Sequence, residues 1–125
     1  MPAYDDRLHV PPAPVALVVV RRPDREQSVG DVPMLIDSGA DATLLPRSAA
    51  TSLGLEGTGE RYQLVGFDGT ASESEAVLAS LAFLRWNFQG RYLLTDADVG
   101  VIGRDILNHL RLLFDGPALH WEAHA

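Results

Sequence analysis

The sequence predicts a mainly β fold with one or two short helices, built as a single domain over residues 1–125. The chain of 125 residues has no low-complexity tract to divide it, and its apolar runs are short and rich in valine. Its 11 glycines and 8 prolines separate these runs, which is typical of strands joined by turns. A domain of this size can bury roughly two-thirds of the surface of its unfolded chain, so a core forms without disulfides.

Charge and composition exclude several function classes. The net charge is −7 and the pI is about 4.8, so we expect no nucleic-acid partner. The chain has no cysteine, which removes thiolate metal sites and cysteine nucleophiles. The run "VALVVV" is too short to cross a bilayer, and the first residues carry early acids instead of an apolar leader. We therefore expect a cytoplasmic protein without a membrane partner, whose residues 1–14 are flexible.

The first half of the chain predicts a hairpin and then a helix. Residues 15–20 and 32–37 are β-branched apolar runs, and the turn signal Gly30-Asp31 precedes the second. In "LLPRSAATSLGL", Pro46 suits the first helical position and Gly54 suits the residue just past the helix end.

The second half predicts mainly strands. Asp68-Gly69 is a strong hairpin-turn dipeptide between two candidate strands in residues 61–77. We expect further strands at residues 91–94 and 99–103, a short helix at 104–110 and a terminal hairpin at 112–121.

The segment "SESEAVLASLAFLRW" fits two structures. Ser72 and Glu75 form a possible capping box, and the leucines that follow are spaced as in a helix. The same residues also alternate as in a strand that is buried on both faces, with Leu81 opposed to Leu78 and Leu84. Local pattern alone does not choose between them.

Few side chains are candidates for chemistry. Among the four histidines, the only close pair is His120 and His124, and these would lie about 13 Å apart along a strand. No phosphate-binding loop, dinucleotide fingerprint or serine-hydrolase elbow is present, so we expect no metal and no cofactor. Asp68 and Asp115 each precede a glycine between strand-like runs, which indicates turns.

Asp37 is the remaining candidate. It follows the apolar residues of "MLI" directly, where an isolated carboxylate is costly to bury without a partner or a use. Gly39 permits a backbone conformation closed to other residues and lets a substrate come close. The Ser38 hydroxyl can hold the loop by bonding to nearby backbone.

These residues carry a resemblance to a known family. "LIDSGADATLL" resembles the active-site loop of the aspartic proteases, and "VGVIGRDIL" resembles the second signature of the retroviral-type enzymes, the retropepsins. "YQLVGFDGTASESEAVLASLAF" lies between them, where these enzymes have their flap hairpin and the strand after it. The order and spacing agree over residues 15–114. The C-terminal segment is more similar to the hairpin of cellular domains of the DNA-damage-inducible type.

The resemblance implies a retropepsin-like acid protease barrel closed by homodimerisation, with a strand at residues 75–84. It implies catalytic roles for Asp37, Ser38 and Gly39, and structural support from Arg104 through an ion pair with Asp41. The implied substrate-binding residues are Ala40, Asp41, Val65, Gly66, Phe67, Asp68 and Gly69, the last five forming a flap. Ser38 replaces the threonine of many members, and Asp105 replaces the asparagine of the viral enzymes.

The implied activity is that of an aspartic endopeptidase acting on peptides or proteins. Such enzymes use two facing aspartates, and this chain has a single Asp-Ser-Gly, so a second copy must supply the other. The resemblance implies that terminal strands of both copies interleave, with Leu112, Phe114, Leu119 and Trp121 facing the partner.

Two alternatives remain. In the first, the fold is retained as a dimerisation or peptide-binding module with weak or no proteolysis. In the second, Asp37 is a buried aspartate that caps a turn in an unrelated β-sandwich.

Overall fold

The computed structural model describes residues 2–24, 26–65 and 69–124. Strands dominate and the two helices are short, which confirms the mainly β fold. The elements follow in the order β1 (Tyr4–Asp5), β2 (Ala13–Arg21), β3 (Ser28–Ile36), β4 (Leu44–Pro46), α1 (Arg47–Leu53), β5 (Gly57–Val65), β6 (Ala71–Phe83), β7 (Trp86–Thr95), β8 (Gly100–Ile102), α2 (Arg104–Leu107), β9 (Arg111–Asp115) and β10 (His120–His124).

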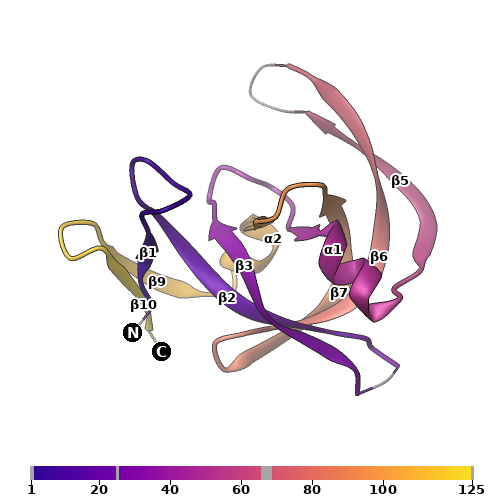
Figure 1. The fold of residues 1–125 in the computed structure, drawn as a ribbon, viewed down its shortest axis with the longest axis horizontal. Helices are drawn as coiled ribbons and strands as arrows, with labels where there is room; N and C mark the ends of the chain where they lie inside the picture. The colour runs from indigo at the N-terminus through magenta and orange to yellow at the C-terminus, as the bar shows by residue number, and fades with distance from the viewer. Residues whose placement is uncertain (1, 25, 66–68, 125) are drawn as a thin grey trace.

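Eight strands form one sheet in the order β1-β2-β3-β8-β4-β7-β6-β5. β2 and β3 form the predicted antiparallel hairpin, and β2 also pairs with β6, so the sheet curls back on itself (Figure 1). Alternate side chains of these strands point into the enclosed core, as the twofold periodicity of a strand requires. The core includes Val18, Val20, Met34, Leu45, Leu81 and Ile102, each at most 1% exposed.

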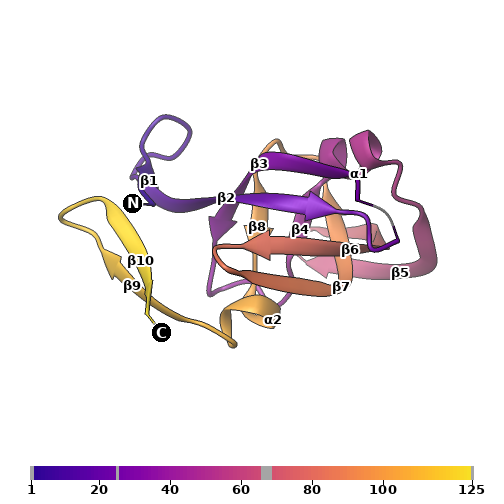
Figure 2. The ribbon, with the colours of Figure 1, turned by 90° about the horizontal axis from the view of Figure 1, so that it is seen from below.

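The last two strands form a separate two-stranded sheet. β9 and β10 make the predicted terminal hairpin, which stands apart from the curled sheet (Figure 2). Trp121 anchors it, because its ring meets that of Phe83 edge-on at 5.8 Å and its indole N–H donates to the Val15 carbonyl oxygen at 3.4 Å. Trp121 is only 1% exposed within the single chain, so the prediction that it faces a partner is wrong.

The ambiguous segment forms β6, as the family resemblance implies. It pairs with β5 on one side and with β7 on the other. Leu81 and Phe83 are fully buried, but Leu78 and Leu84 are about half exposed. The expectation of burial on both faces is therefore wrong, because only one face of β6 packs on the core. Long-range pairing decides this strand against its local helical pattern.

Both predicted helices form, with different ends. Gly54 follows α1 in the left-handed conformation at φ 63°, as expected. Pro46 precedes the first helical residue instead of occupying it. α2 ends at Leu107, three residues earlier than predicted. The residues after α2 form tighter turns of the 3₁₀ type, because the His109 N–H donates to the Ile106 carbonyl and the Leu110 N–H donates to the Leu107 carbonyl.

The N-terminal residues run beside the terminal hairpin. β1 pairs with the start of β2, and Ala3 bridges to His120 of β10. The flexibility expected for residues 1–14 stays a prediction.

Candidate active site

Asp37 lies at the end of β3, where two parallel strands bring distant segments together. Leu35 pairs with Val101 and Ile36 with Ile102 of β8. The pairing continues one step further, because the Asp37 N–H donates to the Ile102 carbonyl at 3.0 Å. The "DSG" and "GRD" segments, at least 64 positions apart in the chain, therefore leave the sheet side by side.

The loop after Asp37 is held by its own backbone. Asp37 Oδ1 accepts the Gly39 N–H at 2.8 Å, and the Asp37 carbonyl accepts the Ala40 N–H at 3.2 Å. Asp37 is half-buried, while Ser38 and Gly39 are exposed. Within the described part of the chain, no other side chain bonds to this carboxylate. The carboxylate is thus fixed in direction with its outer face open.

Arg104 supports the loop from the second segment. Its backbone N–H donates to the Ala40 carbonyl at 2.8 Å, and its guanidinium donates to the Ser38 carbonyl at 2.7 Å. Arg104 therefore contacts the loop as expected, through the carbonyl oxygens of Ser38 and Ala40. The predicted ion pair with Asp41 is wrong for the single chain. Asp41 is exposed and forms no ion pair with any residue that the structure describes.

A hydrogen-bond network behind the loop, centred on a buried threonine, was missed at the sequence level. Thr43 is 1% exposed, and its hydroxyl donates to Asp105 Oδ1 at 2.6 Å while accepting the Gly103 N–H at 3.1 Å. Its own N–H donates to Asp105 Oδ2 at 3.1 Å. A side chain at Gly103 would place its Cβ 2.7 Å from Ala42 backbone, so only glycine permits this approach. A threonine within the apolar run "ATLL" was the available signal, since buried hydroxyls need partners.

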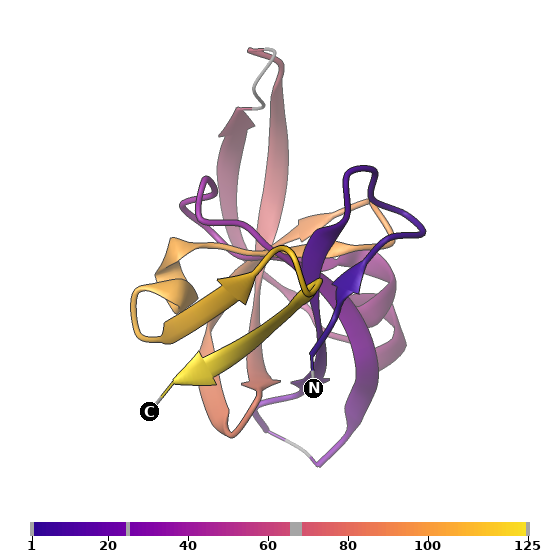
Figure 3. The same cartoon turned by 90° about the vertical axis from the view of Figure 1, so that its left-hand side faces the viewer.

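The candidate substrate-binding residues fall into two groups. Ala40 and Asp41 lie in the loop beside Asp37, the first half-buried and the second exposed. Val65 ends β5 and is 69% exposed, and Gly69 has φ 81° before β6. Gly66, Phe67 and Asp68 lie outside the described residues. The β5–β6 hairpin rises from the body on the side of the loop between β3 and β4 (Figures 1 and 3).

Comparison with known proteins decides the family. The aspartyl protease family matches residues 26–106, which is well over half of the chain and includes Asp37, Arg104 and Asp105. This chain belongs to the aspartyl protease family.

Solved structures agree on the fold of this aspartyl protease family member. It is similar to the EIAV protease complexed with the inhibitor HBY-793, with a TM-score of 0.58 and 24% sequence identity over 78% of this chain and 86% of that one. Among curated proteins no match was found. The retropepsin-like fold is thereby confirmed, and the alternative of an unrelated β-sandwich is wrong.

A hollow of about 450 Å³ borders the aspartyl protease loop. Ser38 and Arg104 form its polar rim. Its other walls come from β2, β3, α2 and β9 and are mainly apolar, comprising Pro14, Ile36, Leu107, Asn108, Leu110, Leu112 and Phe114. The candidate active-site loop and the terminal hairpin therefore share one concave surface.

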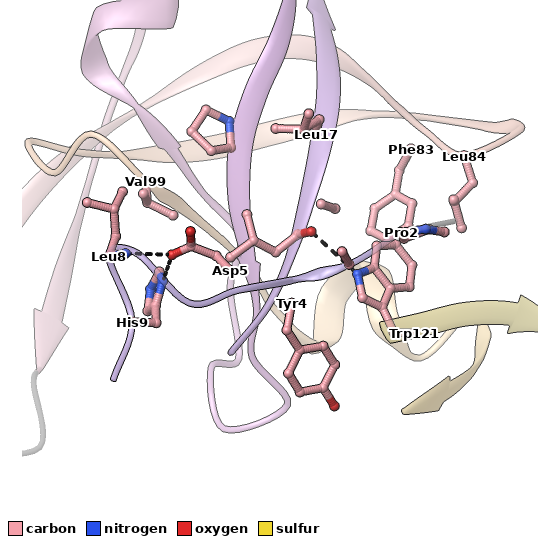
Figure 4. A pocket seen from close by; sticks show the side chains of 14 residues that line it. Pro2, Tyr4, Asp5, Leu8, His9, Leu17, Phe83, Leu84, Val99 and Trp121 are labelled. Carbon is pink, nitrogen blue, oxygen red and sulfur yellow. Dashed lines mark hydrogen bonds and ion pairs between the residues drawn. The ribbon is translucent and has the colours of Figure 1, made fainter. Parts of the chain in front are cut away.

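A second hollow, of about 510 Å³, is lined by residues of β1 and β2 and by Trp121 of the terminal hairpin (Figure 4). Its lining is largely apolar, and it includes none of the candidate site residues. Asp5 lies at its rim, and the hydrogen bond from His9 at 2.8 Å lowers the pKa of that carboxyl.

No helix in residues 2–24, 26–65 and 69–124 is long and apolar enough to cross a membrane.

Proposed function

We propose that this protein is a homodimeric aspartic endopeptidase. One observation carries the proposal: the single Asp-Ser-Gly of the family lies on an exposed loop, where the carboxylate of Asp37 is oriented by Gly39 but open toward solvent. Two copies related by a two-fold axis would place two such carboxylates face to face, which is natural for an isologous interface.

The mechanism follows from two facing carboxyl groups that share one proton. Two adjacent carboxylates do not both ionise at low cost, so one stays protonated. The ionised Asp37 takes a proton from the attacking water, and the protonated one donates a hydrogen bond to the scissile carbonyl oxygen. The water oxygen bonds to the carbonyl carbon. The carboxyl group that took the proton of the water then gives a proton to the leaving amine nitrogen as the C–N bond breaks.

The neighbours of Asp37 position these groups. Ser38 lies next to the proposed two-fold axis, where its hydroxyl can bond to the other copy's loop. Gly39 exposes backbone beside the carboxylate, which lets a substrate backbone approach. Arg104 holds the Ser38 carbonyl at 2.7 Å and so limits movement of the loop. Holding reacting groups in place before reaction is the protein's main contribution to such catalysis.

The cleft would be completed by the β5–β6 hairpin acting as a flap. Ala40 and Asp41 would form its floor, with Val65 to Gly69 closing over an extended peptide. The exposed side chain of Val65 supports this role, since an apolar side chain at the tip of a flap can be buried when a peptide binds beneath it. We keep the cytoplasm as the expected location.

The test is cleavage of a diverse peptide mixture at several pH values by wild type and Asp37→Asn. We expect wild type to cleave with a bell-shaped pH dependence, insensitive to EDTA and inhibited by pepstatin-like compounds that carry a transition-state hydroxyl. The Asp37→Asn rate should fall by at least about 10³-fold, because the substitution removes both shared roles of the carboxyl group. Cleavage that persists in this variant would contradict the proposal.

Mixing experiments separate the enzyme from a silent dimerisation module. A tenfold excess of Asp37→Asn chains should lower wild-type activity about tenfold by subunit exchange, because a mixed dimer has one aspartate. The same excess of albumin is the control. Rates should also rise faster than linearly with enzyme concentration below the dimer dissociation constant. Full dimerisation without any cleavage would favour the module.

A further inference from the structure

The outer face of β3 runs from the second hollow to Asp37. Every second residue of this strand from Val32 to Ile36 is buried in the core. The side chains of Pro33 and Leu35 therefore lie on the other face of the sheet, where both are half-buried. Asp37 continues the alternation, because its N–H still bonds in the ladder with β8. Pro33 thus lies on the same face as Asp37, four strand positions or about 13 Å away.

The neighbouring strands make this face apolar. Leu17 of β2 is registered with Pro33, and Val15 of β2 with Leu35. On the other side of β3, Val101 of β8 is registered with Leu35. Registered residues of paired strands point to the same face, so these five side chains form one apolar strip. The strip leads from the second hollow to the candidate active-site loop.

The second hollow lies at the far end of the apolar strip. Leu17 and Pro33 line it from the sheet, and Leu8 of the loop 6–12 and Trp121 of β10 line it from outside the curled sheet (Figure 4). Its volume of about 510 Å³ falls in the range typical of ligand pockets. Leu17 is 64% exposed and Leu8 is 74% exposed. An apolar group that enters the hollow would cover this surface and be stabilised by it.

Asp5 holds the loop that borders the hollow. One oxygen of its carboxylate accepts the Leu8 N–H at 3.0 Å and a bond from the His9 ring at 2.8 Å, and the other accepts the Arg7 N–H at 3.3 Å. The start of the loop is also fixed, since Asp5 is registered with Ala13 of β2. Leu8 is therefore held beside the hollow before any ligand binds, which lowers the entropic cost of binding.

The position of the hollow indicates which ligand it takes. An extended peptide advances about 3.3 Å per residue, so a peptide with its scissile bond at Asp37 that follows the apolar strip reaches the hollow after about four residues. The loop 6–12 and β10 both lie outside residues 26–106, the part of the chain that matches the aspartyl protease family. Two borders of the hollow are therefore additions of this chain to the part that matches the family.

We infer that the second hollow is a distal specificity pocket, which takes a large apolar side chain about four residues from the scissile bond of a peptide. The inference rests on the proposed endopeptidase function and names a feature of its substrates. The occupant is a peptide because the apolar strip joins the hollow to Asp37 on one face of the sheet. In the proposed homodimer each copy contributes one such hollow, so both ends of a peptide would meet one.

Matched peptides test the preference. They share one cleaved core, taken from the peptide mixture, and carry leucine, alanine or aspartate four residues from the scissile bond on both sides. We expect kcat/KM of the leucine peptide to exceed that of the alanine peptide at least about tenfold, because burial of the larger side chain favours binding. The difference should lie mainly in KM, since this side chain binds equally in the ground state and the transition state. The aspartate peptide should be cleaved least efficiently.

Leu17→Gln tests the sheet side of the hollow. The position is exposed on β2, so the fold should be retained, which thermal unfolding checks. The leucine preference, taken as the ratio of the two peptides with the same variant, should fall to within about twofold, because the amide makes the hollow polar. Leu78→Gln is the matched control, since Leu78 on β6 is 50% exposed and does not line the hollow. Its preference should equal that of wild type.

Asp5→Ala tests the loop side of the hollow. It removes the acceptor that holds Leu8 in place, so the leucine preference should fall at least about threefold, through KM more than kcat. Asp6→Ala removes a neighbouring exposed carboxylate that does not line the hollow, and it should leave the preference unchanged.

Binding is also measured without cleavage, by calorimetric titration of Asp37→Asn with each peptide. The leucine peptide should bind at least about tenfold more tightly than the alanine peptide, and adding Leu17→Gln should remove the difference. Other occupants give other results. Binding of the dye ANS that Leu17→Gln abolishes, without a peptide preference, would assign the hollow to a free apolar molecule. A dimer dissociation constant raised by Leu17→Gln, without a peptide preference, would assign it to a second copy. Either result overturns the inference.

The outcomes separate this inference from the proposed function. Cleavage that depends on Asp37 but is indifferent to this substrate position, or a preference that Leu17→Gln leaves intact, overturns the pocket and leaves the protease. Binding that prefers the leucine peptide and loses the preference in Leu17→Gln, without cleavage by wild type, supports the pocket and overturns the protease. A chain that neither cleaves the peptides nor binds them with a preference overturns both.

Discussion

The two sides of the loop that follows β3 differ sharply in their bonding. On the side facing the body, Thr43 is 1% exposed and makes three hydrogen bonds with Asp105 and Gly103. On the side facing solvent, Ser38 and Gly39 are exposed, and among the residues that the structure describes only Gly39 bonds to the Asp37 carboxylate. The described polar contacts therefore mainly position the loop, and the carboxylate that we propose to be catalytic keeps one face free.

This difference indicates that the backbone of the loop, more than the Asp37 side chain itself, is the part held rigid. In the proposed dimer, the Asp37 carboxylate would have to be held within about 0.5 Å of its working position by its neighbours, because its free face is needed for the other carboxylate and the substrate. The Thr43 network supplies that placement from behind. The open face of Asp37 is then the expected surface of a half-site. Changing the two sides separately should produce effects of different size and kind.

The largest effect should come from breaking the buried side. Thr43→Val keeps the shape of the side chain but leaves the Gly103 N–H without its acceptor and removes one bond from the Asp105 carboxylate. We expect a loss of about 3 kcal/mol of unfolding free energy, because the buried Gly103 N–H is left unsatisfied, which costs about 1–3 kcal/mol, and a hydrogen bond to the Asp105 carboxylate is lost as well. Thermal unfolding measured at neutral pH checks this, and cleavage should fall with it.

Thr43→Ser is the matched control, since it keeps the hydroxyl and loses one methyl group. It should retain most of the stability and nearly all of the activity. If the valine variant unfolds at the wild-type temperature, the Thr43 network is not what holds the loop.

A smaller effect should appear in alkali, at a residue next to the same network. Burial, together with the charge of Asp105, raises the pKa of Tyr92 to about 12. In the unfolded chain this phenol loses its proton near pH 10, whereas the folded chain keeps it until about pH 12. Between these values the unfolded state binds fewer protons, so the free energy of unfolding falls as pH rises, by about 2 kcal/mol in total.

Denaturant unfolding between pH 9 and 12 measures this slope. Tyr92→Phe should flatten it, at the cost of the bond that the Tyr92 hydroxyl donates to the Phe88 carbonyl. Asp105→Asn should shift the ultraviolet titration of Tyr92 to lower pH, because it removes the second cause of the raised pKa. A Tyr92 titration that ignores Asp105 would show that the network's charge does not reach this ring.

The sequence predicted the fold well where long apolar runs and special residues coincide. The valine-rich runs predicted β2 and β3, and Gly54 marked the end of α1 correctly. Local pattern failed over β6, where helical spacing and strand alternation were equal, because the decision comes from pairing with β5 and β7. The exposure of Leu78 was missed for the same reason, since one sequence does not show which face meets the core.

The candidate site was predicted at its centre and missed behind it. Asp37 stood out because a carboxylate after an apolar strand is costly, and the parallel pairing of β3 with β8 brings the second signature beside it. The sequence did not show which groups the side chains around Asp37 would bond to. The resemblance implied that Arg104 would pair with Asp41, but a guanidinium can also donate to backbone carbonyls, and the choice depends on angles that the spacing of residues does not encode.

The smallest effect should come from Arg104, on the exposed side of the loop. An ion pair buried with Asp41 would make its removal cost about 3–5 kcal/mol. The structure instead gives an exposed guanidinium with one charge-assisted bond, 2.7 Å long, to the Ser38 carbonyl. Arg104→Met keeps the length of the side chain and removes the donor, so we expect a loss of about 1 kcal/mol in stability. Its kcat should fall more than its KM changes, because Ser38 and Asp37 move together while the flap is untouched. Arg104→Lys should recover part of the rate, since an ammonium can still donate to that carbonyl but lacks the rigid fork of the guanidinium. A loss as large as that of Thr43→Val would show that Arg104 is buried in the assembled enzyme, and the two sides of the loop would then be equally braced.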